Sequence, residues 1–178
     1  MNRMRIAVVG LALFAAACSD GGVSGRARPA SVRTPVTSEV SRTSGAGLAG
    51  VKPCELISGA EAAGLGLVAP RPRTTAGLQT CEWDGSGNGG LTVAVDVRRG
   101  ADALDYAGDA KTPARFGERD GFSVAAPDGE KDLCHAVISV SASSSVQLVA
   151  SAGGASADTA KACALATRSA ELVAARLP

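Results

Sequence analysis

Cysteine is the residue type that most constrains how this chain can fold. The chain has 178 residues and five cysteines, which are Cys18, Cys54, Cys81, Cys134 and Cys163. An odd number leaves one thiol without a partner if the others form disulfides. Disulfides persist in exported proteins and are rare in the cytosol. The N-terminal residues therefore decide how the cysteines are interpreted.

The first 17 residues have the composition of an export signal. Residues 1–5 contain Arg3 and Arg5, residues 6–14 are an uninterrupted apolar run, and residues 15–17 are alanines. A basic start, a short apolar segment and small residues before a cleavage point are typical of a secretory signal peptide. The apolar run is shorter than the ~20 residues that a transmembrane helix needs. We therefore expect residues 1–17 to be a cleaved signal peptide.

Cys18 directly follows the three alanines, and small residues before a cysteine resemble a bacterial lipobox. The resemblance implies cleavage before Cys18, a diacylglyceryl group on its sulfur, and acylation of the new amino group, with palmitate as a typical chain. Ala15 departs from the pattern, in which leucine is commonest. Two or more acyl chains hold a protein stably at a membrane. We expect a lipid-anchored protein on the extracytoplasmic face of the cell membrane; the alternative is a secreted protein with a free Cys18.

Residues 18–50 are predicted to be a flexible tether. This segment is rich in Ser, Thr, Gly, Ala, Arg and Pro, contains no aromatic residue and has no helical or strand periodicity. Such a composition cannot bury enough apolar surface to offset the entropy of ordering. A flexible chain of this length reaches on the order of 30 Å. Residues 51–178 are then a single folded domain.

Four cysteines remain if Cys18 is lipidated, and they allow three connectivities, between which the sequence alone does not choose. We favour the pairs Cys54–Cys81 and Cys134–Cys163. Each would close a loop of roughly 30 residues and stabilise the fold by roughly 3–4 kcal/mol. A four-cysteine zinc site is the rival interpretation. It is disfavoured because the sequence has no C-x₂-C pair.

Alternating apolar residues predict most of the strands. The clearest alternation is in residues 91–97, and strands are also expected in residues 78–83, 122–126, 134–142 and 146–150. A helical turn is expected at residues 53–57, a brief helix capped by Ser58 and Glu61 after it, a loop at residues 69–77, and a helix at residues 101–108.

The chain ends in a predicted helix over residues 157–177. Its apolar residues have helical spacing, with Cys163, Ala166, Ala170, Val173 and Leu177 on one face. Strands joined by short turns favour an antiparallel sheet. The prediction is an α+β two-layer domain, with an antiparallel sheet of five or six strands, helices on one face and two disulfides.

Residues 81–90, CEWDGSGNGG, contain two patterns that suggest ligand binding. Gly85, Gly87 and Gly90 have the G-x-G-x-x-G spacing of a phosphate-binding loop, but such a loop must open a helix, and here a strand follows. A calcium loop starting at Asp84 would need a glutamate at the position of Val95. We therefore predict a hairpin turn, with glycines that supply positive φ.

Few other residues suggest chemistry. His135 is the only histidine; next to Cys134 in a strand, it would point to the opposite face, so a catalytic pair is not expected. Asp102, Asp105 and Asp109 are interpreted as a solvated acidic face. Trp83 is interpreted as core packing against a disulfide, with contact to a ligand as the alternative. No catalytic residue, metal site or cofactor is predicted.

Nucleic-acid binding is not expected, because the net charge is only +1 and aromatic residues make up 3% of the chain. Neither a basic patch nor a set of base-stacking aromatic residues is present.

A motif in residues 53–66, P-C-E-L-I-S-x-x-E-A-A-x-L-G, is followed by C-E-W at residues 81–83. With the lipobox, the tether and the later Cys134 and Cys163, the chain resembles a family of actinobacterial lipoproteins known as domain of unknown function 3558. The resemblance covers about residues 51–177 and implies an exported, membrane-anchored domain with two disulfides. It supplies no activity and no catalytic residues.

The predicted function is that of a membrane-anchored lipoprotein of the cell envelope, a non-enzymatic domain that binds a small ligand or an envelope partner. The alternative is an envelope hydrolase or a thiol–disulfide redox enzyme. Thiols that titrate in the native protein, or a carboxylate with a strongly raised pKa, would favour the alternative.

Overall fold

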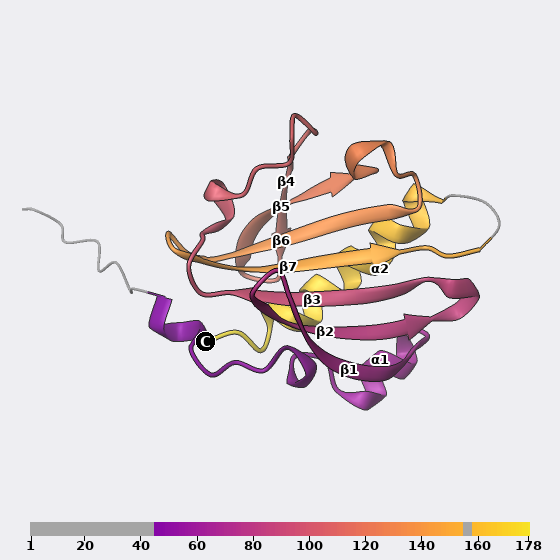
Figure 1. Cartoon of the computed structure of the whole chain (residues 1–178), viewed down its shortest axis with the longest axis horizontal. Helices are drawn as coiled ribbons and strands as arrows, with labels where there is room; N and C mark the ends of the chain where they lie inside the picture. Colours follow the sequence, from indigo (N-terminus) through magenta and orange to yellow (C-terminus); the bar gives the residue numbers. More distant parts are fainter. Residues whose placement is uncertain (1–44, 155–157) are drawn as a thin grey trace, which may run out of the picture. The chain divides into compact units, whose positions relative to one another are not determined.

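The computed structural model describes residues 45–154 and 158–178 (Figure 1). The predicted signal peptide, Cys18 and most of the predicted tether lie outside the described residues. These residues form seven strands: β1 (Leu67–Thr75), β2 (Leu78–Gly85), β3 (Gly90–Asp96), β4 (Thr112–Phe116), β5 (Arg119–Ala125), β6 (Leu133–Ser141) and β7 (Ser144–Ser151). The α-helices are α1 (Gly59–Gly64) and α2 (Thr159–Ala174), and the 3₁₀ turns are η1 (Gly45–Leu48), η2 (Pro53–Glu55), η3 (Ser86–Asn88), η4 (Ala101–Ala103) and η5 (Pro127–Gly129).

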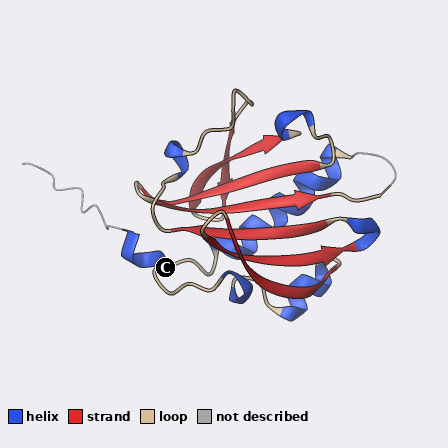
Figure 2. Cartoon of the chain, viewed as in Figure 1, coloured by secondary structure: helices blue, strands red, loops and turns tan. Residues whose placement is uncertain are grey.

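All seven strands form one antiparallel sheet in the order β1-β2-β3-β7-β6-β5-β4 (Figure 2). The prediction of an α+β domain with an antiparallel sheet is confirmed, but the expected five or six strands were too few. The two unpredicted strands, β1 and β4, are the edges of the sheet. An edge strand tolerates proline because one side of its backbone needs no partner. Pro70 and Pro72 therefore lie in β1, where the sequence predicted a loop, and Pro113 lies in β4.

The predicted helix at residues 101–108 is wrong. Only the single turn η4 forms, and the chain then leaves the helical conformation. Ala107 and Gly108 have φ angles of 51° and 96°, which a right-handed helix does not permit. The C-terminal helix is confirmed as α2, which ends at Ala174; the first residue of the prediction, Ala157, lies outside the described residues.

Both α-helices pack against one face of the sheet, where the main core lies. Buried residues of α2, from Ala162 to Ala174, meet the inward residues of β6 and β7, and Ala62 of α1 belongs to the same cluster. The opposite face of the sheet is also partly covered. Ala101 and Leu104, from the segment that was expected to be helical, cover Phe122 and Val137 in a second, smaller core. The prediction of helices on one face therefore holds for α1 and α2, with η4 on the other face.

The folded domain begins before Val51. Leu48, in η1, lies within the expected tether, yet its side chain is only 1% exposed and belongs to the main core. The sequence placed this boundary too late because one leucine among small residues gives no periodic signal.

The two disulfides form between the favoured pairs. The Cα atoms of Cys54 and Cys81 are 5.0 Å apart, and those of Cys134 and Cys163 are 4.9 Å apart. The first bond joins η2 to β2, and the second joins β6 to α2. Because Cys134 is on the inward side of β6 and 1% exposed, the second disulfide fixes the last helix to the sheet, as the sequence predicted.

Candidate functional site

A cavity of about 230 Å³ lies beside the N-terminal half of α2. Its walls come from four places in the chain: the end of α1 with the start of β1, the β2–β3 turn, the end of β7, and one side of α2. The residues that line it are Leu65, Gly66, Leu67, Gly85, Gly89, Gly90, Ser151, Ala152, Lys161, Ala164, Leu165 and Arg168. We call it the glycine-turn pocket, since the turn of residues 85–90 forms one wall.

The glycines allow this turn to pack closely against the ends of β7 and β2. A Cβ atom on Gly89 would lie 2.6 Å from the Ser151 carbonyl oxygen, and one on Gly90 would lie 2.4 Å from the Trp83 carbonyl oxygen. Such distances do not occur between real atoms, so both positions need glycine. Gly87 has a φ of +68°. The predicted turn is confirmed, but positive φ explains only Gly87, and close packing explains Gly89 and Gly90.

One stripe of α2 forms the opposite wall. Lys161, Ala164, Leu165 and Arg168 are spaced three and four residues apart, so their side chains share one side of the helix. This stripe is separate from the buried stripe that packs on the sheet. Leu165 is half-buried, and both basic side chains are exposed. The pocket therefore has an apolar interior and two cationic groups at its rim.

Half of the twelve basic side chains that the structure describes form ion pairs with carboxylates. Among the residues that the structure describes, neither Lys161 nor Arg168 has an ion-pair partner within 4 Å. Elsewhere the arginines are mostly paired: Arg71 with Asp84 and Arg176 with Glu61, for example. The pocket lining contains no aspartate or glutamate. Its positive charge is therefore not neutralised by a lining carboxylate.

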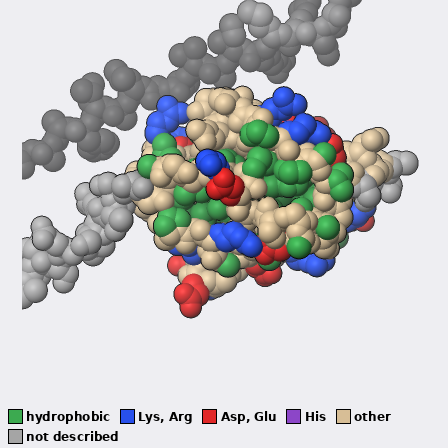
Figure 3. Space-filling model, turned by 90° about the horizontal axis from the view of Figure 1, so that it is seen from below, with side chains coloured by type: hydrophobic (Ala, Val, Ile, Leu, Met, Phe, Trp, Pro, Cys, Tyr) green, Lys and Arg blue, Asp and Glu red, His purple; other side chains and the backbone are tan. Residues whose placement is uncertain are grey.

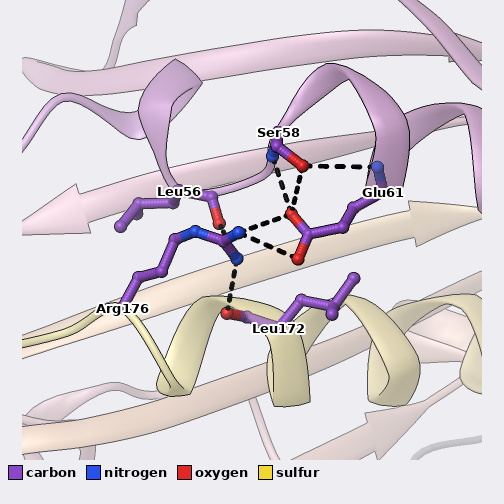
Figure 4. A network of polar contacts seen from close by, with 5 residues as sticks. All are labelled: Leu56, Ser58, Glu61, Leu172 and Arg176. Atoms are coloured by element: carbon purple, nitrogen blue, oxygen red, sulfur yellow. Dashed lines mark hydrogen bonds and ion pairs between the residues drawn. The ribbon is translucent and has the colours of Figure 1, made fainter.

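A polar network fixes α1, and with it the Leu65 wall, against α2 (Figure 4). Ser58 caps α1 by accepting a hydrogen bond from the Glu61 N–H, and the Ser58 N–H and hydroxyl donate to Glu61 Oε2 at 2.9 and 2.7 Å. Arg176, just after α2, binds Glu61 with Nη2 at 2.7 Å from Oε2. The Arg176 Nη1 also donates to the carbonyl oxygens of Leu56 and Leu172. The predicted capping box is confirmed, and the arginine extends it to a second helix.

Replacing Glu61 with glutamine is expected to destabilise the domain at neutral pH and to do so less in acid. The hydrogen bond from the Ser58 hydroxyl and the contact with Arg176 lower the pKa of Glu61 from 4.5 to about 2. A lowered carboxyl pKa contributes stability above pH 4.5, and this contribution is lost as the pH falls from 4.5 to about 2. Urea unfolding of the wild type and Glu61→Gln between pH 7 and pH 2 should give curves that converge in this range. A pH-independent difference would contradict the assignment, and Glu55→Gln, which changes an exposed carboxylate outside the network, is the matched control.

Trp83 lies in the core, not at the pocket. It is 3% exposed, is opposite Leu91 in the β2–β3 ladder, and belongs to the main buried cluster together with the disulfide-bonded Cys81. The core-packing interpretation agrees with this position. Contact between Trp83 and a ligand would require the core to open, because the ring offers no free face to solvent.

His135 is on the opposite face of the sheet from the Cys134 disulfide, as expected from its place in a strand. It is half-buried rather than solvent-facing, and its ring centroid is 5.3 Å from that of Tyr106. Burial lowers the pKa of His135, which keeps the imidazole neutral at pH 7. Nearby acidic side chains accept backbone hydrogen bonds: Asp105 accepts one from the Ala107 N–H in its own loop, and Asp109 accepts one from the Asp128 N–H in another loop.

The expected acidic helix face of Asp102, Asp105 and Asp109 does not exist, because that segment is not a helix.

In residues 45–154 and 158–178, no three His, Cys, Asp or Glu side chains are grouped as metal ligands. The same residues include no helix with the length and hydropathy required to cross a membrane. On the face drawn in Figure 3, apolar patches alternate with basic and acidic groups, and neither charge sign forms a continuous area.

The pocket residues were not predicted from the sequence. Lys161, Leu165 and Arg168 lie within the predicted helix over residues 157–177, and none of them was expected to contact a ligand. The spacing of 161, 164, 165 and 168 is a second helical stripe, and this was the available signal. Nothing in the sequence indicated that the β2–β3 turn would lie opposite it.

Comparison with protein families places the chain in one of them. The family described as "Protein of unknown function (DUF3558)" matches residues 13–176, which is most of the chain. The protein therefore belongs to the DUF3558 family, and the resemblance in the sequence motifs is confirmed. No curated protein and no solved structure matches the chain.

Proposed function

We propose that this DUF3558 protein is a lipoprotein, anchored through Cys18 to the extracytoplasmic face of the membrane, whose domain binds a small ligand and catalyses no reaction. The glycine-turn pocket is the observation that carries the binding role. It is built from four segments of a domain crosslinked by two disulfides. A rigid, preformed site of this kind loses little entropy when a ligand enters.

The composition of the pocket supports binding over catalysis. Its lining has no histidine, cysteine or carboxylate, and Ser151 is the only hydroxyl-bearing residue. The Ser151 hydroxyl lies 3.5 Å from Asp132 Oδ2, a long contact for activation of a nucleophile. Acyl or phosphoryl transfer usually needs a nucleophile and a base within hydrogen-bond reach.

The disulfides also support a structural role over a redox one. Cys81 is 0% exposed and Cys134 is 1% exposed, so each bond has one sulfur-bearing residue inside the core. Thiol–disulfide exchange requires a thiolate to reach a sulfur atom. A count of free thiols in the native protein tests this directly: we expect none in the domain, and one reactive pair would favour the redox alternative.

Lipidation is tested with Cys18→Ser in a bacterial host that processes lipoproteins. We expect the wild-type protein in the membrane fraction, with an intact mass corresponding to residues 18–178 plus acyl groups. Cys18→Ser should lose the acyl mass and the mature N-terminus. Cleaved wild-type protein that carries no lipid and is secreted would contradict the anchor, and detection of a cytosolic, fully reduced wild-type protein would contradict export altogether.

A further inference from the structure

We propose that the glycine-turn pocket selects an anion carried on a short apolar chain, such as a carboxylate or phosphate ester with an alkyl tail. This inference rests on the proposed binding function and specifies the ligand class. Lys161 and Arg168 would hold the anionic group at the rim, and the leucines would pack against the tail.

The charges that line the pocket indicate that the ligand is negatively charged. The lining includes two cations and no carboxylate, and neither cation has an ion-pair partner among the described residues. Lys161 and Arg168 are seven residues apart, which places them two turns apart on the same side of α2. An anion between them would form charge-assisted hydrogen bonds without first breaking an internal ion pair.

The apolar interior of the pocket indicates that part of the ligand is apolar. Among the lining residues, Leu67 and Ala152 are 2% and 3% exposed, while Leu65 and Leu165 are half-buried. The cavity of about 230 Å³ is slightly smaller than most drug-sized sites. It therefore fits a short chain, or the end of a longer one, better than a fused-ring ligand.

The position of Leu165 connects the cationic rim of the pocket with its apolar interior. It lies between Lys161 and Arg168 on the same helical stripe, four residues after one and three before the other. A ligand that contacts both cations must therefore pass over Leu165. An inorganic anion would leave this apolar surface exposed to water, whereas an alkyl chain would cover it.

The test uses octanoate and octyl phosphate as probes, with residues 18–178 carrying Cys18→Ser so that no lipid is attached. Binding is followed through backbone amide signals in two-dimensional NMR. Octanoate and octyl phosphate should shift the amides of Gly85, Gly89 and Leu165. Octanol, the octyltrimethylammonium cation and inorganic phosphate should bind at least tenfold more weakly. Binding should also weaken as the ionic strength rises from about 0.05 M to about 0.5 M, since the cations are exposed.

Two variants separate the anionic and apolar contacts. Lys161→Gln combined with Arg168→Gln keeps the helix and should weaken octanoate binding at least tenfold, which corresponds to about 1.4 kcal/mol. Ala164→Leu fills the pocket and should abolish binding while both cations remain. Arg98→Gln removes a charge that lies outside the pocket and has no ion pair within the described part of the chain, and Thr167→Leu adds bulk on the exposed side of α2; both variants should bind like the wild type.

A further arm distinguishes the source of the anion. If vesicles containing phosphatidylglycerol compete with octyl phosphate for the same amides, the ligand is a membrane lipid headgroup; if they do not compete, it is a free amphiphile. Equal affinity for octanol and octanoate, or no amide shift at the pocket with either anionic probe, would overturn the proposed ligand class. Neither result would affect the lipidation and free-thiol experiments, so the proposed function is tested separately.

Discussion

Replacing Trp83 with alanine should lower the free energy of unfolding by about 3–5 kcal/mol, because a large side chain leaves a cavity in a close-packed core. Trp83 is 3% exposed, and its strand neighbours Cys81 and Leu91 are 0% and 2% exposed. The surrounding structure is held by the Cys54–Cys81 disulfide, which limits collapse into the cavity. This is a large fraction of the 5–15 kcal/mol that typically stabilises a domain.

Urea unfolding followed by circular dichroism measures this effect. Trp83→Phe is the matched variant, since it keeps an aromatic ring and should cost less than alanine. Trp83 is the only tryptophan, so the wild-type emission should be typical of a buried indole and move to longer wavelength on unfolding. A loss below about 1 kcal/mol in Trp83→Ala, together with loss of octanoate binding, would instead assign Trp83 to the ligand site.

The sequence predicted the elements whose signals are local. The capping box of Ser58 and Glu61 and the apolar face of α2 depend on contacts within one helix or between neighbouring turns. The alternation in β3 reflects burial of one side of the strand, where Leu91, Val93 and Val95 belong to the main core. The number of cysteines and the expectation of export predicted two disulfides, and the favoured pairing agrees with the structure.

The strands that were not predicted, β1 and β4, form because each pairs with an adjacent strand. β1 contains Pro70 and Pro72, and Ala69 in the same strand has a φ of 54°. Proline and a left-handed alanine both argue against a strand when the sequence is considered alone. The hydrogen bonds to β2 override these preferences, because only one side of an edge strand must pair. The same reasoning applies to β4.

The candidate site was missed for a related reason. Each segment has a sufficient local explanation: residues 85–90 are a turn, and Lys161 and Arg168 are exposed charges on a helix. The pocket exists only because Gly89 lets the turn approach Ser151 closely, opposite α2. Gly89 and Ser151 are 62 positions apart in the sequence, and a contact over such a separation has no periodicity that one sequence could reveal.

Removing the Cys134–Cys163 disulfide by Cys134→Ala with Cys163→Ala should lower the free energy of unfolding by roughly 3–4 kcal/mol, since the bond closes a loop with a sequence separation of 29. The pair Cys54→Ala with Cys81→Ala should cost a similar amount for a separation of 27. Double replacement avoids a free thiol in either variant.

The two loops do not overlap in sequence, and their crosslinks join different elements, so the two losses should be nearly additive. Removing all four cysteines would then cost roughly 7 kcal/mol, comparable with the whole stability of many domains. We expect the four-alanine variant to be largely unfolded at 37 °C, whereas each two-alanine variant should keep a cooperative urea transition. Because Cys163 lies between Lys161 and Leu165 on α2, the variant lacking Cys134–Cys163 should also bind octanoate less tightly at temperatures where it is still folded. Unchanged binding and a stability loss below about 1 kcal/mol would mean that core packing alone holds α2 on the sheet.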